Sequence, residues 1–560
     1  MHMFVAFVVS AVNTSTVGDS SYDTFEADAM APIWRPFETG DRLHLPCTPS
    51  TRLKVCGPQL ICARWHSPTY RCEECRYDDE CASLAPEQVC IKEFDNPHTI
   101  CAHKSLLDPG IDPRDTWGLA LAFFACAIAA GGGIGGGGLL LPVLILVFSF
   151  TPHEATPLSN VTILGGAIAN FMFNGRRMHP SDRKRLISYE VALMMEPMTI
   201  FGALLGCLLN KMLPTWLITT LLVLLLGVTT DRTLKRGMKG WKRETRQKTT
   251  SAAGAALLTA EPTYTHAVRM DHGSAYHPPS ELLEKREAPP SWGGVALMGG
   301  VAIVQPASSE EGATELAAMI AREKRIPGVD VGLLICALVG SSVLSLLRGR
   351  SKKESLLHVV CGSSSYWLLN LAQLLFLLTV SLYIRFLLMR RHTRRLAIGY
   401  PFGPDDVLWD TRKALAYPLI CALAGLCAGM FGIGGGIIKG PLMLEMGLSP
   451  DVSSATSAYM ILFTTAAASI QYALFGALRA HYASALFLTG LIGTVCGQYV
   501  VRALIKRSGR ESLIVILIAV VIGVSTLLMG SIGAYTFVQE LSAGQDQGLR
   551  NVCDSEPPDR

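Results

Sequence analysis

Long apolar runs recur along most of the chain and alternate with polar or basic stretches. Several of these runs exceed the roughly 18 apolar residues that indicate a membrane-spanning helix. The pattern therefore predicts an all-α polytopic membrane protein embedded in a lipid bilayer. The runs fall at residues 117–150, 157–174, 188–209, 213–230, 330–347, 365–388, 414–446, 454–476, 482–502 and 512–538.

Two of the runs, 117–150 and 414–446, are interrupted by glycines. A straight helix over 117–150 would be about 50 Å long, against about 30 Å for the hydrocarbon core. The first run contains GGGIGGGG at 131–138 and the second contains FGIGGG at 431–436, here called the first and second glycine segments. Glycine tolerates positive φ, so each segment can break a helix and reverse the chain. Each run is therefore either a kinked span or a re-entrant hairpin.

The two glycine segments belong to an internal repeat. Broken helices at matching positions in two halves are the usual sequence sign of a transporter's binding site. A shift of 299 residues places Gly133, Gly135, Gly136 and Pro142 on Gly432, Gly434, Gly435 and Pro441. Ala155-Thr156 matches Ala455-Thr456 at a shift of 300, and the pair Gly202/Gly206 matches Gly493/Gly497 at a shift of 291.

Basic residues distinguish hairpins from full spans, because Lys and Arg accumulate in cytosolic loops. With hairpins, and with the N-terminal region outside, the loops 174–188, 231–248, 385–413 and 502–510 are cytosolic with 24 Lys and Arg, and six lie outside. With full spans, nine lie inside and 21 outside. The bias favours hairpins from opposite faces, as in an inverted repeat. The basic stretch 348–364 remains outside and is the exception.

Eight of the 16 cysteines lie within the polar region 18–115. Such a region cannot fold on an apolar core alone, and disulfides are the usual remedy outside the cytosol. Cys72-x-x-Cys75 is compatible with a zinc site, but no second pair at matching spacing accompanies it. Disulfides in an extracellular or lumenal domain are favoured, no metal is predicted, and the pairing stays open. The cysteines concerned are Cys47, Cys56, Cys62, Cys72, Cys75, Cys81, Cys90 and Cys101.

The remaining boundaries follow the alternation of apolar and polar stretches. A short apolar run followed by Ser and Thr predicts a signal peptide over 1–17. The Ala-, Ser- and Pro-rich stretch 231–328 predicts a disordered cytosolic linker. The other parts are a first transmembrane repeat (116–230), two linking helices (329–390), a basic cytosolic loop (391–413), a second repeat (414–540) and a polar tail (541–560).

Hairpins from opposite faces would bring both glycine segments to the middle of the membrane. The half-helix after each segment would point its N-terminus at the other, and free N–H groups at the positive end of a helix dipole favour anions. Glycine also lets a ligand approach the backbone closely. The alternative is close helix packing. The candidate binding residues of the segments are Gly133, Gly135, Gly136, Gly432, Gly434 and Gly435.

Two charged residues lie within the apolar runs. Lys439 follows the second glycine segment, and its counterpart in the first half is Leu140. A Lys at the bilayer centre costs about 2.5–3.5 kcal/mol on insertion scales and indicates a functional site by default. Lys439 is therefore a candidate partner of an anionic substrate, the alternatives being snorkelling or pairing with Glu445. Glu196 is a candidate proton-coupling carboxylate, with an interfacial position as the alternative.

Polar residues after each glycine segment could complete a hydrogen-bonding pocket. Their alternative role is to cap the helix that follows. These candidates are Thr156, Asn160, Thr456 and Ser457.

Other classes of function lack support in the sequence. The net charge of +4 is small for 560 residues, so no nucleic-acid partner is predicted. No Walker motif and no catalytic constellation occur, so we expect neither ATP-driven transport nor an enzyme, and no cofactor. The oligomeric state stays open, a homo-oligomer included.

The stretch AGMFGIGGG at 428–436, with Pro441 and the Ala-Thr-Ser of 455–457, resembles the signature of the sulfite exporter TauE/SafE family. The first half carries a similar pattern, and the resemblance covers about 116–230 and 414–540. It implies a transporter of anionic sulfur compounds, with both glycine segments, Thr156 and Thr456-Ser457 in the translocation site. The chain departs from the family at Pro157, which stands where the second half has Ser457, and in its Cys-rich region, which bacterial members mostly lack.

We therefore expect a secondary transporter of small anions, sulfite or organosulfur anions. It would be a multi-pass protein of the plasma membrane or an endomembrane, with the Cys-rich region extracellular or lumenal. One alternative is a receptor or adhesion protein acting through the Cys-rich region, although an anchor needs no broken helices. The other alternative is an ion channel, which the sequence does not separate from a carrier.

Overall fold

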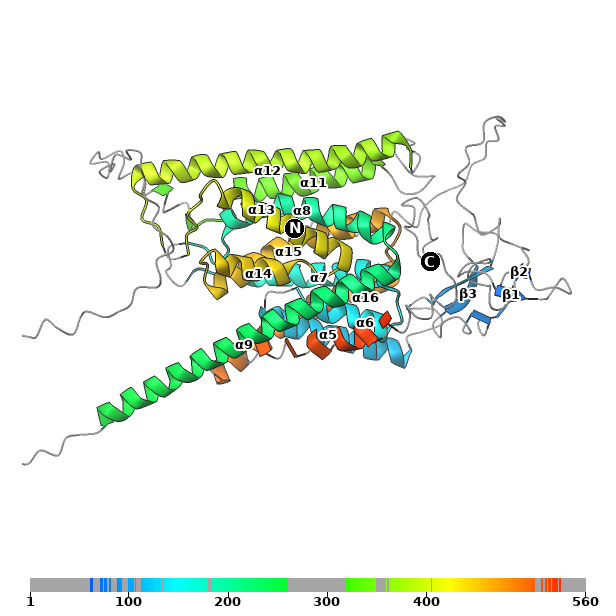
Figure 1. The fold of residues 1–560 in the computed structure, drawn as a ribbon, viewed down its shortest axis with the longest axis horizontal. Helices are drawn as coiled ribbons and strands as arrows, with labels where there is room; N and C mark the ends of the chain where they lie inside the picture. The colour runs from blue at the N-terminus through cyan, green and yellow to red at the C-terminus, as the bar shows by residue number, and fades with distance from the viewer. Residues whose placement is uncertain are drawn as a thin grey trace, which may run out of the picture.

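The computed structural model describes most of residues 112–259 and 323–508, apart from 133–134, 180–183, 349–358, 360–361 and 404. It also describes short stretches between residues 61 and 106, residues 318–319 and 321, and parts of the chain between 515 and 534. Within these residues, six helices are long and apolar enough to cross a membrane. The prediction of an all-α polytopic membrane protein is confirmed (Figure 1).

The two repeats contain the same four helices in the same order. The first repeat consists of α5 (Pro113–Gly132), α6 (Gly137–Leu146), α7 (Pro152–Asn174) and α8 (Tyr189–Met212). The second consists of α13 (Lys413–Phe431), α14 (Gly436–Glu445), α15 (Pro450–Leu474) and α16 (Ala480–Ser508). The helices α9 (Thr215–Thr259), α11 (Gly328–Arg348) and α12 (Ser364–Ile398) lie between them in the sequence.

Each glycine segment reverses the chain, so that a long and a short helix pack side by side. A Cβ atom on Gly136 would lie 3.1 Å from that of Ala129, and one on Gly118 would lie 2.5 Å from the ring of Phe148. The ends of α5 and α6 therefore meet again where the hairpin opens. In the second repeat, a Cβ on Gly435 would lie 3.3 Å from that of Ala428. Both runs are hairpins and neither is a kinked span.

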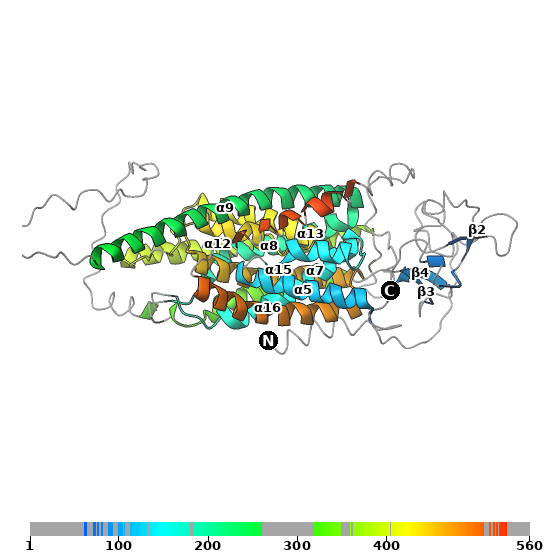
Figure 2. The ribbon, with the colours of Figure 1, turned by 90° about the horizontal axis from the view of Figure 1, so that it is seen from below.

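The two hairpins open at opposite ends of the helical bundle (Figures 1 and 2). At the end next to the Cys-rich region, Arg479 Nη2 binds Glu154 Oε1 at 2.5 Å, beside the opening of the α5–α6 hairpin. At the other end, the backbone amide of Ser449 donates to Asp405 Oδ1 at 2.5 Å, beside the opening of the α13–α14 hairpin. The repeats are therefore inverted, as predicted.

The last helix of each repeat packs against the hairpin of the other repeat. A Cβ on Gly202 of α8 would lie 1.9 Å from the carbonyl oxygen of Ala422 in α13. A Cβ on Gly497 of α16 would lie 2.2 Å from the carbonyl oxygen of Ala127 in α5. These glycines serve close helix packing, since any side chain would separate the backbones.

The basic loops contact one another at the end of the bundle where the α13–α14 hairpin opens. Arg395 Nη1 binds Glu190 Oε2 at 2.7 Å, His179 Nε2 lies 2.7 Å from Asp405 Oδ2, and Lys184 pairs with Asp406. The basic loops 174–188 and 385–413 thus share one end of the molecule, as the hairpin arrangement requires. Which side of the membrane this end faces remains a prediction.

Two predicted boundaries differ from the structure. Helix α9 continues to Thr259, so the first part of the segment 231–328, predicted to be disordered, is helical. Helix α12 continues to Ile398, so the predicted loop 391–413 begins inside a helix. Both extensions are rich in Lys, Arg, Glu, Gln or Ala, which favour helix without being apolar. The end of an apolar run was therefore a poor guide to the end of the helix.

The described part of the Cys-rich region holds two small antiparallel sheets. Strand β1 (Ile61–Ala63) pairs with β2 (Arg71–Glu73), which aligns Cys62 with Cys72. Strand β3 (Gln88–Lys92) pairs with β4 (Thr99–His103), which aligns Cys90 with Cys101.

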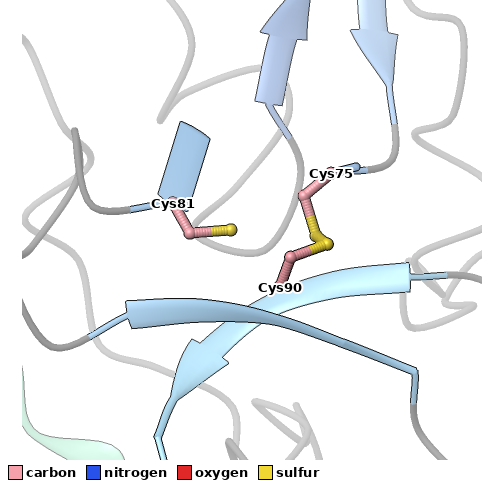
Figure 3. Close-up of side chains that lie close together, drawn as sticks. All are labelled: Cys75, Cys81 and Cys90. Atoms are coloured by element: carbon pink, nitrogen blue, oxygen red, sulfur yellow. A yellow bond between two sulfur atoms is a disulfide. The ribbon is translucent and has the colours of Figure 1, made fainter. Parts of the chain in front are cut away.

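Disulfides link the described cysteines of this region. Cys75 and Cys90 form a disulfide, and the sulfur of Cys81 lies within 4.8 Å of both (Figure 3). Cys62 and Cys81 also belong to disulfides. Because these sulfurs are bonded to sulfur, they are not free to bind zinc, and the disulfide interpretation is confirmed for these four residues. Cys47, Cys56, the side chains of Cys72 and Cys101, and the predicted signal peptide lie outside the described residues.

Candidate functional site

Both glycine segments use backbone conformations that favour glycine. Gly135 and Gly136 have φ of +82° and +77°, and Gly434 and Gly435 have φ of +69° and +70°. An L-residue with a side chain is strained at such angles, by about 1–2 kcal/mol in the left-handed helical region. Gly136 and Gly435 are the N-cap residues of α6 and α14. An N-cap glycine with positive φ therefore precedes both half-helices.

The two glycine segments touch in the centre of the bundle. A Cβ on Gly137 would lie 2.4 Å from the Cα of Ile433. The side chains of Ile163 on α7 and Ile461 on α15 approach both Gly135 and Gly434 within 3.6 Å of a Cβ built on either glycine. The N-termini of α6 and α14 consequently meet. The first backbone hydrogen bonds of these helices are donated by Leu139 to Gly136 and by Ile438 to Gly435, so the first two N–H groups of each helix precede the helical hydrogen-bond pattern.

Contacts in the centre correct one detail of the repeat. Helices α7 and α15 begin at Pro152 and Pro450, and Ile163 and Ile461 occupy equivalent places against the glycine segments. Ser159 is therefore equivalent to Ser457, and Thr156 is not equivalent to Thr456. The linker before α15 is one residue shorter than the linker before α7, since residues 447–448 and 148–150 lie between the respective cap residues. The match of two Ala-Thr pairs in the sequence does not reveal this difference.

Three polar residues of α7 lie beside the second glycine segment: the predicted Thr156 and Asn160, and Ser159 between them. Ser159 Oγ donates to the carbonyl oxygen of Gly432 at 2.7 Å. Asn160 Nδ2 donates to the carbonyl oxygen of Thr156 at 3.2 Å, while the buried Asn160 Oδ1 accepts no hydrogen bond from any described residue. Thr156 Oγ1 donates to the carbonyl oxygen of Pro152 within α7. Asn160 is thus the member of this group with spare hydrogen-bonding capacity.

The predicted polar residues of the second half separate into two places. Thr456 Oγ1 accepts the backbone amide of Ser188 at 3.0 Å, at the start of α8. Thr456 therefore serves a helix start, which was its alternative role. Ser457, the equivalent of Ser159, is buried, and its hydroxyl has no hydrogen-bond partner among the described residues. Gly133, predicted as a binding residue, lies outside the described residues.

Lys439 and Glu196, predicted independently, form an ion pair. Lys439 Nζ lies 3.0 Å from Glu196 Oε2, and both side chains are 0% exposed. The hydroxyl of Thr464 joins them, accepting from Lys439 Nζ at 2.7 Å and donating to Glu196 Oε1 at 2.5 Å. The pair is therefore internally balanced, and neither snorkelling nor Glu445 satisfies Lys439.

The ion pair adjoins the second glycine segment. Lys439 Cε would lie 3.5 Å from a Cβ on Gly435, so the lysine stem crosses the start of α14. Sequence reasoning missed Thr464, because a threonine within an apolar helix carries no signal of its own until the fold brings Glu196 and Lys439 to it.

A small cavity lies beside the first glycine segment. Its volume of about 10 Å³ has room for about one water molecule. It is lined by Gly135, Ile163, Asn170, Ile461 and Thr494, among others. Asn170 Oδ1 accepts from Gln498 Nε2 at 2.7 Å, and the same nitrogen donates to the carbonyl oxygen of Ala130 at 2.8 Å. A four-atom oxyanion would not fit in this cavity, so in this conformation the cavity is closed to such an anion.

Known proteins match this chain over most of its length. The family model described as "Sulfite exporter TauE/SafE" matches residues 118–304 and 311–527. The Arabidopsis thaliana protein "Sulfite exporter TauE/SafE family protein 3" is 28% identical over 436 residues, 78% of this chain and 82% of the relative. "Sulfite exporter TauE/SafE family protein 2" of the same plant is 28% identical over 77% of this chain and 86% of the relative. No solved structure matches.

Proposed function

Since the chain belongs to the sulfite exporter TauE/SafE family of membrane transporters, we propose that it carries small anions, sulfite or organosulfur anions, across a membrane as a secondary transporter. The observation that supports this most is the meeting of two half-helix N-termini, contributed by inverted hairpins, in the centre of the bundle. Positive dipole ends and unpaired N–H groups at such a place attract anions. If the glycine segments only allowed close packing of helices, the two N-termini would not need to meet.

Unused hydrogen-bonding groups beside the glycine segments support an anion site at this place. The buried Asn160 and Ser457 each keep a polar atom without a partner among the described residues. Leaving such a group buried and unpaired costs about 1–3 kcal/mol. The Ser457 hydroxyl and first-turn N–H groups can donate to an oxyanion, whereas Asn160 Oδ1 can only accept, for example from a protonated oxyanion such as hydrogensulfite.

The buried ion pair supports a coupling role for Glu196. In the closed conformation Glu196 neutralises Lys439. If Glu196 takes up a proton, Lys439 keeps an unbalanced positive charge next to Gly435, and an anion then compensates it. Proton uptake and anion binding would in this way favour each other. A channel needs no such linkage, so we propose a carrier.

Orientation follows from the positive-inside bias. We propose that the end carrying the loops 174–188 and 385–413 faces the cytosol and that the Cys-rich region is extracellular or lumenal. Labelling of single cysteines introduced at Arg394 and at Trp117 with an impermeant maleimide tests this arrangement. Trp117 alone should react from the extracellular or lumenal side, and the opposite pattern would reverse the orientation.

Flux in proteoliposomes tests the function directly. Purified protein should take up and release radiolabelled sulfite with saturation, and sulfate and taurine serve as comparators. Gly435→Leu should abolish the flux, since its φ is +70° and Ala428 and Lys439 crowd the position. The matched control is Gly440→Leu, because Gly440 lies in the same helix α14 and faces open space.

Two outcomes would contradict the proposal. Folded protein that moves no sulfur anion would exclude these substrates. Normal flux in Gly435→Leu would reduce the glycine segments to a packing role.

A further inference from the structure

Helix α11 ends away from the glycine segments, at the end of the bundle next to the Cys-rich region (Figure 1). A second positively charged residue is buried there. Arg348, the last residue of α11, is 2% exposed. Its Nη1 donates to Asn370 Oδ1 on α12. Among the described residues, its buried Nε and Nη2 have no hydrogen-bond partner and no carboxylate pairs with it.

Aromatic rings cover the guanidinium without using its remaining donors. The Cζ atom lies 5.3 Å from the centroid of the Tyr366 ring and 5.1 Å from that of Phe475. Cation–π contacts hold the guanidinium through ring faces and leave its N–H edge unpaired. Lys211 Nζ lies 5.2 Å from the same Phe475 centroid, so a second cation adjoins the place.

The polar groups one helical turn away are satisfied, in contrast to Arg348. Ser345 Oγ donates to Gln471 Oε1 at 2.9 Å, and Gln373 Nε2 donates to Ser345 Oγ at 2.6 Å. The unpaired guanidinium edge is therefore a property of Arg348 and not of the whole interface between α11, α12 and α15. A buried charge without a partner is costly, and within a membrane protein it indicates a functional site.

The two unpaired donors have a particular geometry. The N–H bonds of Nε and Nη2 point in parallel from one edge of the planar guanidinium, which matches two oxygens of an oxyanion. The opposite edge is closed by the side chain's own Cδ, and Nη1 is taken by Asn370. Arg348 thus presents one complete bidentate edge.

Residues between this place and the second glycine segment interact with one another. The Cys207 thiol interacts electrostatically with Arg348 and is hydrogen-bonded with the Tyr472 hydroxyl. That hydroxyl donates to the carbonyl oxygen of Gly429 at 2.7 Å, in the last turn of α13. An anion held at Arg348 would therefore lie on the Cys-rich side of the α13–α14 hairpin, which contains the second glycine segment.

We propose that Arg348 is an anion-binding residue that holds a small oxyanion through Nε and Nη2, at a site separate from the glycine segments. Lys211 lies beside the same Phe475 ring, at the edge of the site. The same chemistry would accept the phosphate of a lipid headgroup, so the test separates a free anion from a lipid. The site does not depend on the role proposed for the glycine segments.

Calorimetric binding of sulfate and of sulfite to the full-length protein tests the site, in lipid-free neutral detergent at constant ionic strength. Arg348→Gln should weaken binding by about 10- to 100-fold, the equivalent of losing hydrogen bonds to a charged group. Arg348→Lys keeps the charge but loses the bidentate edge, and it should weaken binding by about tenfold. The matched control is Arg390→Gln, because Arg390 stacks on Phe386 but is exposed.

The outcomes are distinguishable. Arg348-dependent binding that persists in Gly435→Leu supports a site of its own, even where the flux experiment fails. Equal binding by wild type, Arg348→Lys and Arg348→Gln overturns the proposal. An absence of saturable binding in both wild type and Gly435→Leu also overturns it, and this outcome can be seen without any Arg348 variant. Arg348-dependent thermal stabilisation by phosphatidylglycerol, without binding of sulfate or sulfite, identifies a lipid phosphate as the source of the oxyanion.

Discussion

The two repeats share one backbone and differ in the chemistry of their centres. Each forms a hairpin whose ten-residue half-helix starts after a positive-φ glycine. Lys439 and Thr464 of the second repeat form a buried charged cluster with Glu196 of α8, against the half-helix α14. The equivalent residues on the other side are Leu140, Phe487 and Gly166, which are apolar or lack a side chain.

This difference separates what the fold needs from what the chemistry adds. The half-helix of the first repeat packs without any charge, so the ion pair is not required to build a hairpin. Burying two ions costs several kcal/mol each before their attraction is counted, and apolar residues of similar volume are often as stable. A buried pair in only one of two equivalent places is therefore better explained by a function than by stability.

The largest effect should come from breaking the ion pair. Lys439→Leu or Glu196→Leu alone leaves one uncompensated buried charge, which costs about 3–5 kcal/mol of unfolding free energy. The double variant Lys439→Leu/Glu196→Leu gives this half the apolar character of the other and should recover most of that loss. Thermal unfolding in detergent measures the stability, and sulfite flux should be absent in all three.

The double variant can also contradict the functional interpretation of the ion pair. If it were as unstable as the single variants, the pair would be a structural requirement of the second hairpin. If it transported sulfite with an unchanged dependence on a proton gradient, Glu196 would have no coupling role.

The next effect should be equal in the two halves. Gly136→Ala and Gly435→Ala each place a Cβ at positive φ and within 3.3 Å of another side chain. Each should lower the unfolding free energy by about 1–2 kcal/mol. Gly440→Ala is the control, because it meets open space within a helix and should stabilise by up to about 1 kcal/mol. Unequal losses at Gly136 and Gly435 would show that the hairpins do not share one backbone requirement.

A smaller effect should distinguish the equivalent serines. Ser159→Ala removes the hydrogen bond to Gly432 and should cost about 1 kcal/mol of stability. Ser457→Ala removes no hydrogen bond among the described residues, so stability should change little. If Ser457 contacts substrate, its variant should instead raise the KM for sulfite about fivefold, as expected for one hydrogen bond. An unchanged KM would remove Ser457 from the proposed site.

The sequence carried more of the fold than of the site. Glycine spacing and loop charge were enough to predict inverted hairpins, because both reflect the backbone and the membrane directly. The pairing of Lys439 with Glu196 was out of reach, since 243 residues separate them and no local pattern relates them. Thr456 was assigned to the substrate site through a repeat match that the structure shifts by two residues.

Arg348 shows a different limit of sequence reasoning. It belongs to the basic stretch 348–364, which is the exception to the positive-inside bias, and no local pattern in the sequence predicts its burial. Its burial between Tyr366 and Phe475 depends on α11, α12 and the end of α15 coming together. Only the packed structure distinguishes a buried guanidinium from an ordinary basic loop residue.

The smallest effect concerns how α7 and α15 begin. Helix α7 carries its own capping box, in which the Thr151 amide donates to Glu154 Oε2 at 2.8 Å. Helix α15 is instead capped from a distant loop: the amide of its N-cap residue Ser449 donates to Asp405 Oδ1. Asp405 also contacts His179. A local cap should tolerate a neutral substitute, whereas the borrowed carboxylate should show a pH dependence.

Burial tends to raise the pKa of Asp405, but the hydrogen bonds from Ser449 and His179 outweigh it and hold the pKa below its ordinary value of 3.8. The carboxylate therefore stabilises the folded state above about pH 4, and this contribution disappears as the pH falls through the lowered pKa. Asp405→Asn should cost about 1 kcal/mol at pH 7 and progressively less below pH 4. Glu154→Gln should keep the capping box, because glutamine also completes one, but it loses the charge that pairs with Arg479 and should cost about 1 kcal/mol or less at pH 7. Thermal unfolding across this pH range measures both, and a cost of Asp405→Asn that does not change with pH would show that Asp405 acts by shape and not by charge.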